Sequence, residues 1–61
     1  MTRTYALCRL LEHGPLTWRE VLEVTGWSYG VVKSAIWRAM QYGWIEPHVR
    51  RGTAHYVYEL A

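Results

Sequence analysis

The chain has 61 residues, which suffice for one small domain and leave no room for a second, and its hydrophobic content of 51% argues against disorder. Its single cysteine, Cys8, excludes an intramolecular disulfide and a zinc site built on paired cysteines. No apolar run is long enough for a membrane span or a signal peptide, so we expect a cytoplasmic protein that does not associate with membranes.

The net charge of +2 is small but unevenly distributed. Acidic and basic residues cancel in residues 1–27, so the whole positive excess lies in residues 28–61. The charged residues of that second part are Lys33, Arg38, Arg50 and Arg51, against Glu46 and Glu59. A positive excess confined to one part of the chain favours a polyanionic partner.

The first predicted helix runs from about Arg3 to His13, with Thr2 as its N-cap and Gly14-Pro15 as its stop. Apolar residues at helical spacing form one stripe along it, which we expect to face the core. The residues of this stripe are Leu7, Leu10 and Leu11. Leu16 then lies in a short extended stretch before the next helix.

The second predicted helix is short and begins with a recognisable cap. Thr17 and Glu20 have the spacing of a capping box, in which each side chain accepts a hydrogen bond from the other residue's amide. The helix is expected from about Trp18 to Val24, burying Val21 and Val24 against the core.

The third predicted helix follows after a very short turn. Gly26 suits the left-handed position that ends the second helix, and Ser28 caps a helix from about Tyr29 to Tyr42 that ends at Gly43. Its apolar face consists of Val32, Ala35, Ile36, Ala39 and Met40, and its polar face of Gly30, Lys33, Ser34, Trp37, Arg38 and Gln41. A tryptophan on a polar face either packs on a neighbouring side chain or contacts something outside the monomer.

After the third helix, apolar and polar residues alternate with a period of two, which predicts a β-hairpin. Pairing Ile45 with Tyr58 and Val49 with Ala54 would place the apolar residues of both strands on one face. This register leaves Arg51-Gly52 at the turn.

The same register would place His48 directly opposite His55 on the outer face of the hairpin, with Val57 exposed beside them. Two imidazoles can bind a metal ion, but a site needs further ligands, and Glu46 and Glu59 are not expected to converge with them. We therefore predict no metal site.

Residues 25–45 resemble the helix-turn-helix core of bacterial and phage winged-helix regulators. The pattern is a glycine, a Ser or Thr cap, an apolar triad, and a glycine followed by an apolar pair. It is filled here by Gly26, Ser28, Val32, Ile36, Ala39, Gly43, Trp44 and Ile45. The resemblance implies an α+β fold, a winged helix-turn-helix in which three helices are followed by a two- or three-stranded β wing, as one domain over residues 1–61. In such domains the stretch equivalent to Leu16 often pairs with the wing.

The resemblance also implies where DNA would bind. The recognition helix, at about residues 28–42, would enter a major groove, and the wing tip, residues 50–53, would reach the backbone or an adjacent minor groove. A helix N-terminus can hold a phosphate, and a basic wing tip suits a narrow minor groove. The residues expected to contact DNA are Ser28, Tyr29, Gly30, Lys33, Ser34, Trp37, Arg38, Gln41, Arg50, Arg51 and Thr53.

Together these features predict sequence-specific binding of double-stranded DNA by a small, phage-like transcriptional regulator of the repressor type, acting as a homodimer in the nucleoid. Two alternatives stay open: a winged module that docks on a host protein through Trp37, Trp44 and Val57, and an architectural or excision factor that bends DNA. An enzyme is not expected, because the chain has no Asp, no glycine-rich phosphate loop and no nucleophile motif. Neither catalytic residues nor a cofactor are predicted.

Overall fold

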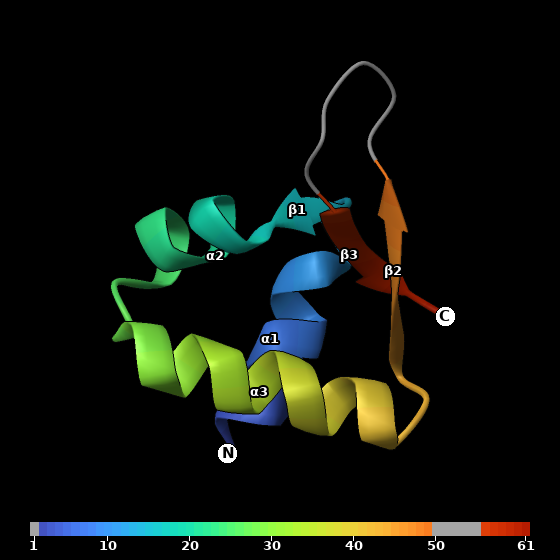
Figure 1. Ribbon diagram of the computed structural model, residues 1–61, viewed down its shortest axis with the longest axis horizontal. Coiled ribbons are helices and arrows are strands. Elements are labelled where there is room, and N and C mark those ends of the chain that lie inside the picture. The colour runs from blue at the N-terminus through green and yellow to red at the C-terminus, as the bar shows by residue number, and fades with distance from the viewer. Residues whose placement is uncertain (1, 50–55) are drawn as a thin grey trace.

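Three helices and three strands make up the chain in the computed structural model, which describes residues 2–49 and 56–61 (Figure 1). The elements are α1 (Arg3–Leu11), β1 (Leu16–Thr17), α2 (Trp18–Thr25), α3 (Tyr29–Gln41), β2 (Ile45–Val49) and β3 (Tyr56–Leu60). The fold is therefore α+β, with a three-stranded antiparallel sheet beside the helices, and it is compatible with the winged helix that the sequence predicts. Among the described residues, no helix combines the length and the apolar character that a membrane crossing requires.

Local capping interactions define α2 and the turn after it, as the sequence predicts. The Glu20 amide donates to Thr17 Oγ1 at 3.1 Å, and the Thr17 amide donates to Glu20 Oε1 at 2.8 Å, so the capping box is complete. At the other end, Gly26 has a left-handed φ of 70°, and its amide donates to the Leu22 carbonyl at 2.9 Å. The Ser28 side chain then caps α3 by accepting from the Val31 amide at 3.3 Å.

The sheet has the order β1-β3-β2, so β3 lies in the middle and β2 at one edge. Leu16 of β1 pairs with Tyr58, which confirms that the short extended stretch joins the two C-terminal strands. The predicted register of those strands is wrong: Ile45 pairs with Leu60 instead of Tyr58, and Val49 with Tyr56 instead of Ala54. A shift by an even number of residues keeps every side chain on its predicted face, so the apolar pattern alone does not distinguish the two registers. The predicted turn at residues 51–52 lies outside the described residues.

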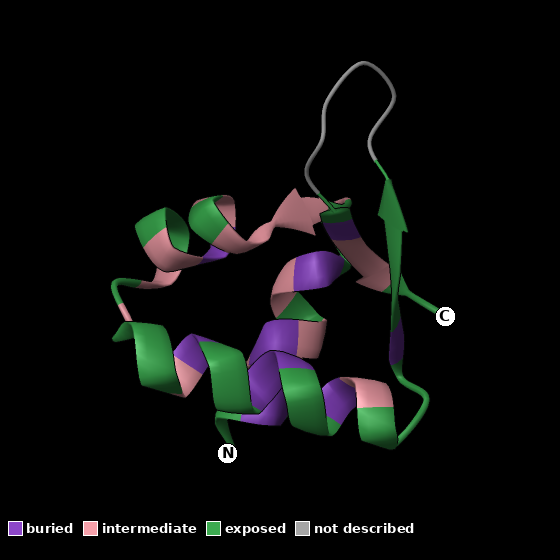
Figure 2. Cartoon of the chain, in the orientation of Figure 1, coloured by how far each residue is buried: buried purple, intermediate pink, exposed green. Residues whose placement is uncertain are grey.

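The core lies where α1, α2 and α3 meet the inner face of the sheet. In Figure 2 the buried positions of α1 and α3 face each other. The buried cluster consists of Leu7, Leu11, Val21, Val32, Ala35, Ile36, Ala39 and Ile45. The partly buried Tyr58 and Met40 pack against it, so the predicted inner face of α3 is confirmed. On the predicted inner face of the strands, only Ile45 and Tyr58 among the described residues reach the core, whereas Val49, Tyr56 and Leu60 are exposed.

Three further predicted burial assignments are wrong. Leu10 is only partly buried, because Thr4 joins Leu7 and Leu11 on the inner face of α1 and turns Leu10 to its margin. Val24 is 61% exposed, because the side of α2 that packs on the core is formed by Val21 with the partly buried Trp18 and Leu22.

The burial of Val57 is the third of these wrong assignments. This residue was expected to be exposed, but only 7% of it is exposed. It lies on the central strand, with Thr17 of β1 paired on one side and His48 of β2 on the other. A central strand has neighbours along both edges, which cover its side chains even on the outer face of the sheet.

Candidate nucleic-acid interface

The outer face of α3 is open to solvent along its whole length. Of the residues predicted to contact DNA, those in the described part of the chain are all exposed: Ser28, Tyr29, Gly30, Lys33, Ser34, Trp37, Arg38 and Gln41. Arg50, Arg51 and Thr53 lie outside the described residues. One continuous helix therefore brings the first eight together on a single surface, behind which Val32, Ala35, Ile36 and Ala39 hold the helix to the core.

The N-terminus of α3 is held by its own cap and by an aromatic contact. The ring of Tyr29 lies 5.0 Å from the ring of Trp18 in α2, centroid to centroid, with the planes inclined by 33°. The first amides of a helix have no carbonyl partner within the helix, and the helix dipole is positive at that end. The start of α3 is therefore a fixed, exposed donor site for an anionic group.

The middle of α3 presents a shallow hollow lined by Lys33, Ser34, Trp37 and Arg38. The Trp37 side chain is 58% exposed, so of the two predicted roles for this residue, packing within the monomer is the one that the geometry disfavours. A flat apolar ring between two cations can contact a thymine methyl group or a sugar while the cations meet phosphates.

A groove between the start of α1 and the outer face of α3 extends this surface. It is lined by Thr2, Arg3, Thr4, Ser28, Gly30, Val31, Ser34, Ala35 and Arg38. Arg3 and Arg38 thus line one groove from two different helices, together with the hydroxyl groups of four further residues, Thr2, Thr4, Ser28 and Ser34. Arg3 was not among the residues predicted to contact DNA, since nothing in the local pattern indicates that the start of α1 lies beside α3.

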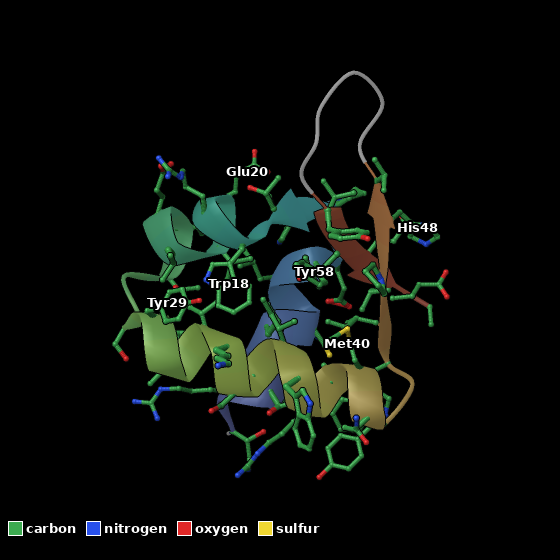
Figure 3. All side chains as sticks on the ribbon, viewed as in Figure 1. Trp18, Glu20, Tyr29, Met40, His48 and Tyr58 are labelled. Carbon is green, nitrogen blue, oxygen red and sulfur yellow. The ribbon has the colours of Figure 1, made fainter. Side chains whose placement is uncertain are left out.

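An aromatic groove lies between α2 and β3 and reaches Tyr29 at the start of α3. It is lined by Thr17, Trp18, Arg19, Leu22, Tyr29, Tyr56 and Tyr58. Figure 3 labels Trp18, Tyr29 and Tyr58 from its lining. Burial raises the pKa of Tyr58 above its ordinary value, and the neighbouring Tyr56 adds to the rise. Trp18 Nε1 is buried and has no hydrogen-bond partner within residues 2–49 and 56–61. This groove, with Arg19 at its side, was not predicted, because no local pattern indicates that α2 lies beside β3.

An apolar surface separate from α3's polar face lies around the end of that helix and the C-terminal strand. The rings of Tyr42 and Trp44 are in contact, with centroids 4.7 Å apart and planes inclined by 38°, and the two residues are 62% and 45% exposed. Trp44 also lines a groove with Tyr5, Cys8, Gly43, Leu60 and Ala61. Burial raises the pKa of the Cys8 thiol, which disfavours the reactive thiolate.

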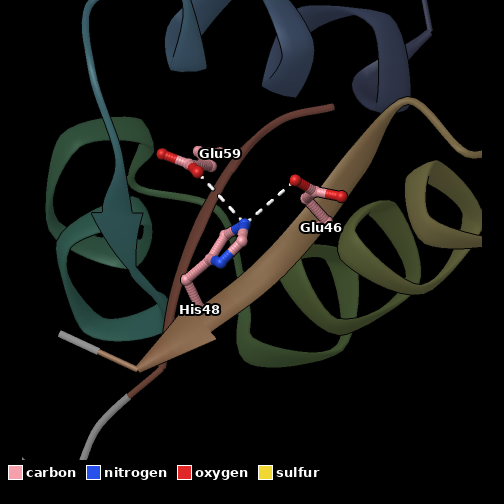
Figure 4. Close-up of side chains that lie close together, drawn as sticks. All are labelled: Glu46, His48 and Glu59. Carbon is pink, nitrogen blue, oxygen red and sulfur yellow. Dashed lines mark hydrogen bonds and ion pairs between the residues drawn. The ribbon is translucent and has the colours of Figure 1, made fainter.

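The outer face of β2 and β3 carries a cluster that was not predicted. Glu46 and Glu59 are directly paired across the two strands, and both approach His48, contrary to the expectation that they would not converge (Figure 4). The predicted register caused this error, because it placed His48 opposite His55 instead of Val57 and moved Glu59 away from Glu46.

None of the protein-family models, curated proteins or solved structures with which the chain was compared matches it. Its function is therefore inferred from its own residues. The surface that stands out is the exposed face of α3 with Lys33 and Arg38, extended by the groove that Arg3 lines and by the aromatic groove at the start of the helix.

Proposed function

We propose that the protein is a winged helix-turn-helix protein that binds double-stranded DNA in a sequence-specific manner. The observation that carries this proposal is the outer face of α3, which is exposed throughout, holds Lys33 and Arg38, and includes no carboxylate. A polyanion can approach such a face without meeting a like charge.

The connection between α2 and α3 supports the proposal. Only residues 26–28 separate the helices, and both sides of this turn are fixed, by the left-handed Gly26 and by the Ser28 cap. A short, rigid turn between two helices, the second with a free polar face, is the arrangement that places a recognition helix in a major groove. We accordingly assign the recognition helix to residues 28–42.

Each part of the α3 face has a role in this proposal. Lys33, Ser34 and Trp37 meet base edges in the groove, because they lie at the centre of the exposed face. Arg38 and Gln41, together with the amides at the start of the helix, meet phosphates at the groove rim. Arg3 adds a phosphate contact from α1. The wing tip, residues 50–53, is assigned to the backbone or minor groove on sequence grounds alone, because it lies outside the described residues.

The proposal extends to a repressor-like regulator that binds as a homodimer, since one helix and one wing give a modest interface that two copies would double. Selection of bound fragments from a random duplex library tests this, with enrichment of a palindrome as the expected result. Enrichment of a non-palindromic sequence that is bent in the complex would favour the architectural alternative.

The affinity test uses the selected duplex and a random duplex at low and high salt. The variant Lys33→Ala/Arg38→Ala should bind both duplexes more weakly and with a smaller salt dependence than the wild type. Arg9→Ala is the matched control, because it removes a positive charge from an exposed side chain on α1 that is paired with Glu12 at 3.5 Å. Binding of the double variant at wild-type strength would refute the proposal.

The second candidate function is docking on another protein, favoured by the exposed Tyr42–Trp44 pair and the apolar groove beside it. Aromatic side chains that are exposed together are common anchors of protein interfaces. If the wild-type protein shows no salt-sensitive binding to any duplex, this candidate replaces DNA binding.

A further inference from the structure

The outer face of the β2–β3 pair gathers three metal-ligating side chains. Side chains alternate along a strand, so Glu46 and His48 of β2 lie on the same face, and the cross-strand pairing of Glu46 with Glu59 adds the third. This face is the one opposite Ile45, which is buried in the core. From this convergence we propose that Glu46, His48 and Glu59 form a binding site for a divalent transition-metal ion of the zinc type.

The distances within the cluster suit a shared cation. His48 Nε2 lies 3.0 Å from Glu46 Oε1 and 3.1 Å from Glu59 Oε1, and one ligand atom from each residue lies within 4.8 Å of the other two (Figure 4). Ligand bonds of about 2.1 Å in a tetrahedral site separate neighbouring ligand atoms by roughly 3.4 Å. Glu46 and His48 are exposed and Glu59 is partly buried, so small rotations of these side chains suffice to bring all ligand atoms to bonding distance of one ion.

Hydrogen bonds from His48 alone cannot satisfy both carboxylates of this cluster equally well. A single imidazole nitrogen carries at most one proton, yet Nε2 faces an oxygen of each of two carboxylates. A divalent ion replaces that one proton and accepts a lone pair from the nitrogen and from both oxygens at once.

The charges of the cluster point to a cation as well. Like charges directly opposite each other on an antiparallel pair destabilise the pairing of the strands. Within residues 2–49 and 56–61, Glu46 and Glu59 form no ion pair except with His48. A bound divalent ion would neutralise the two carboxylates without requiring His48 to be protonated.

The ligand set selects the class of metal. One imidazole nitrogen and two carboxylate oxygens match the ligands that Zn²⁺ takes, with a fourth position left for water. Mg²⁺ and Ca²⁺ prefer sets made of oxygen alone, so they should bind more weakly here. The metal site includes no residue of α3, so its proposal does not depend on whether the protein binds DNA.

Calorimetric titration of the metal-free protein with zinc chloride at neutral pH tests the site. We expect one ion per chain, binding at least tenfold weaker in both His48→Asn and Glu59→Gln, and no comparable binding of magnesium chloride. His13→Asn is the matched control, since His13 is an exposed histidine on the α1 side of the molecule, and it should bind Zn²⁺ like the wild type. Equal zinc affinity in the wild type, His48→Asn and Glu59→Gln would overturn the proposal, as would no binding at all.

A spectroscopic readout on the wild-type protein keeps the test independent of how the variants fold. In an NMR titration with zinc chloride, the ring resonances of His48 should shift or broaden first among the three histidines of the chain. If the resonances of another histidine respond while those of His48 do not, the ion binds elsewhere and the proposal fails.

Discussion

The rings of Trp18 and Tyr29 are in contact across the turn between α2 and α3, with their centroids 5.0 Å apart. Trp18 is the first residue of α2 and Tyr29 the first residue of α3, so the contact joins the N-termini of the two helices. The orientation of α3 therefore depends on this pair as well as on the turn at Gly26.

Loss of the ring at position 29 should lower stability. Tyr29→Ala removes an aromatic contact worth about 0.5–1.5 kcal/mol beyond its buried area, whereas Tyr29→Phe retains it. A thermal melt should show a lower Tm for the Ala variant only. If the Tyr29 hydroxyl also contacts DNA, the Phe variant will bind the duplex more weakly at unchanged Tm. Equal melting of the Ala variant and the wild type would show that the ring contact is not structurally important.

Leu7 and Leu10 should differ sharply on truncation, although both belong to the leucine stripe of α1. Leu7 is fully buried and Leu10 is not, so Leu7→Ala should cost about 2–5 kcal/mol and Leu10→Ala clearly less. A domain of this size has a total stability of about 5 kcal/mol or little more, so Leu7→Ala could unfold it at ambient temperature. Chemical denaturation of both variants measures the loss in free energy of unfolding. A larger loss for Leu10→Ala than for Leu7→Ala would contradict the burial described above.

Stability should fall at alkaline pH through Tyr58. Burial raises the pKa of Tyr58 in the folded state, so the folded chain holds this proton more tightly than the unfolded chain does. The resulting stabilisation is complete below the unfolded pKa of about 10 and is lost as the pH rises through the folded pKa. Tyr58→Phe should therefore lose less stability than the wild type between neutral and strongly alkaline pH. Thermal melts across this range test it, with Tyr5→Phe as the exposed control, which should follow the wild type.

Arg3 provides a test of the groove between α1 and α3. If its side chain contacts a phosphate, Arg3→Ala should reduce the slope of log affinity against log salt by up to about one unit per monomer, and should weaken all duplex sequences alike. Arg9 lies on the same helix, and Arg9→Ala should leave the slope of log affinity against log salt unchanged. An equal reduction in both variants would indicate a general effect of charge instead of a contact in the groove.

Ser34 and Trp37 should carry much of the base preference. Ser34→Ala and Trp37→Ala are expected to narrow the difference in affinity between the selected and the random duplex, with little change in salt dependence, because neither side chain is charged. Both positions are exposed, so the Tm should stay near that of the wild type. Competition binding with the two duplexes measures this difference. If the ratio of the affinities for the selected and the random duplex is unchanged in both variants, Ser34 and Trp37 do not read bases.

Local signals predicted much of the fold. The cap at Thr17, the left-handed Gly26 and the cap at Ser28 act over a few residues, so their residue types suffice to place α2 and the start of α3. The exposed face of α3 was equally predictable, because helical periodicity separates Lys33 from Ile36 without knowledge of the partner elements.

Features that depend on distant parts of the chain were not predictable in this way. The register of β2 against β3 was missed by two residues, and with it the convergence of Glu46 and Glu59 on His48. Arg3 and Arg38 line the same groove because α1 packs against α3, and no local pattern encodes that packing.

The position of β2 at the edge of the sheet bears on how copies of the chain can associate. An exposed edge strand offers free backbone groups on which another strand can assemble, which is a route to aggregation. Here the edge strand includes Pro47, which has no amide to donate, between the polar side chains of Glu46 and His48. Extension of the sheet from one copy to the next along β2 is therefore disfavoured, and self-association of the protein should proceed through side-chain surfaces.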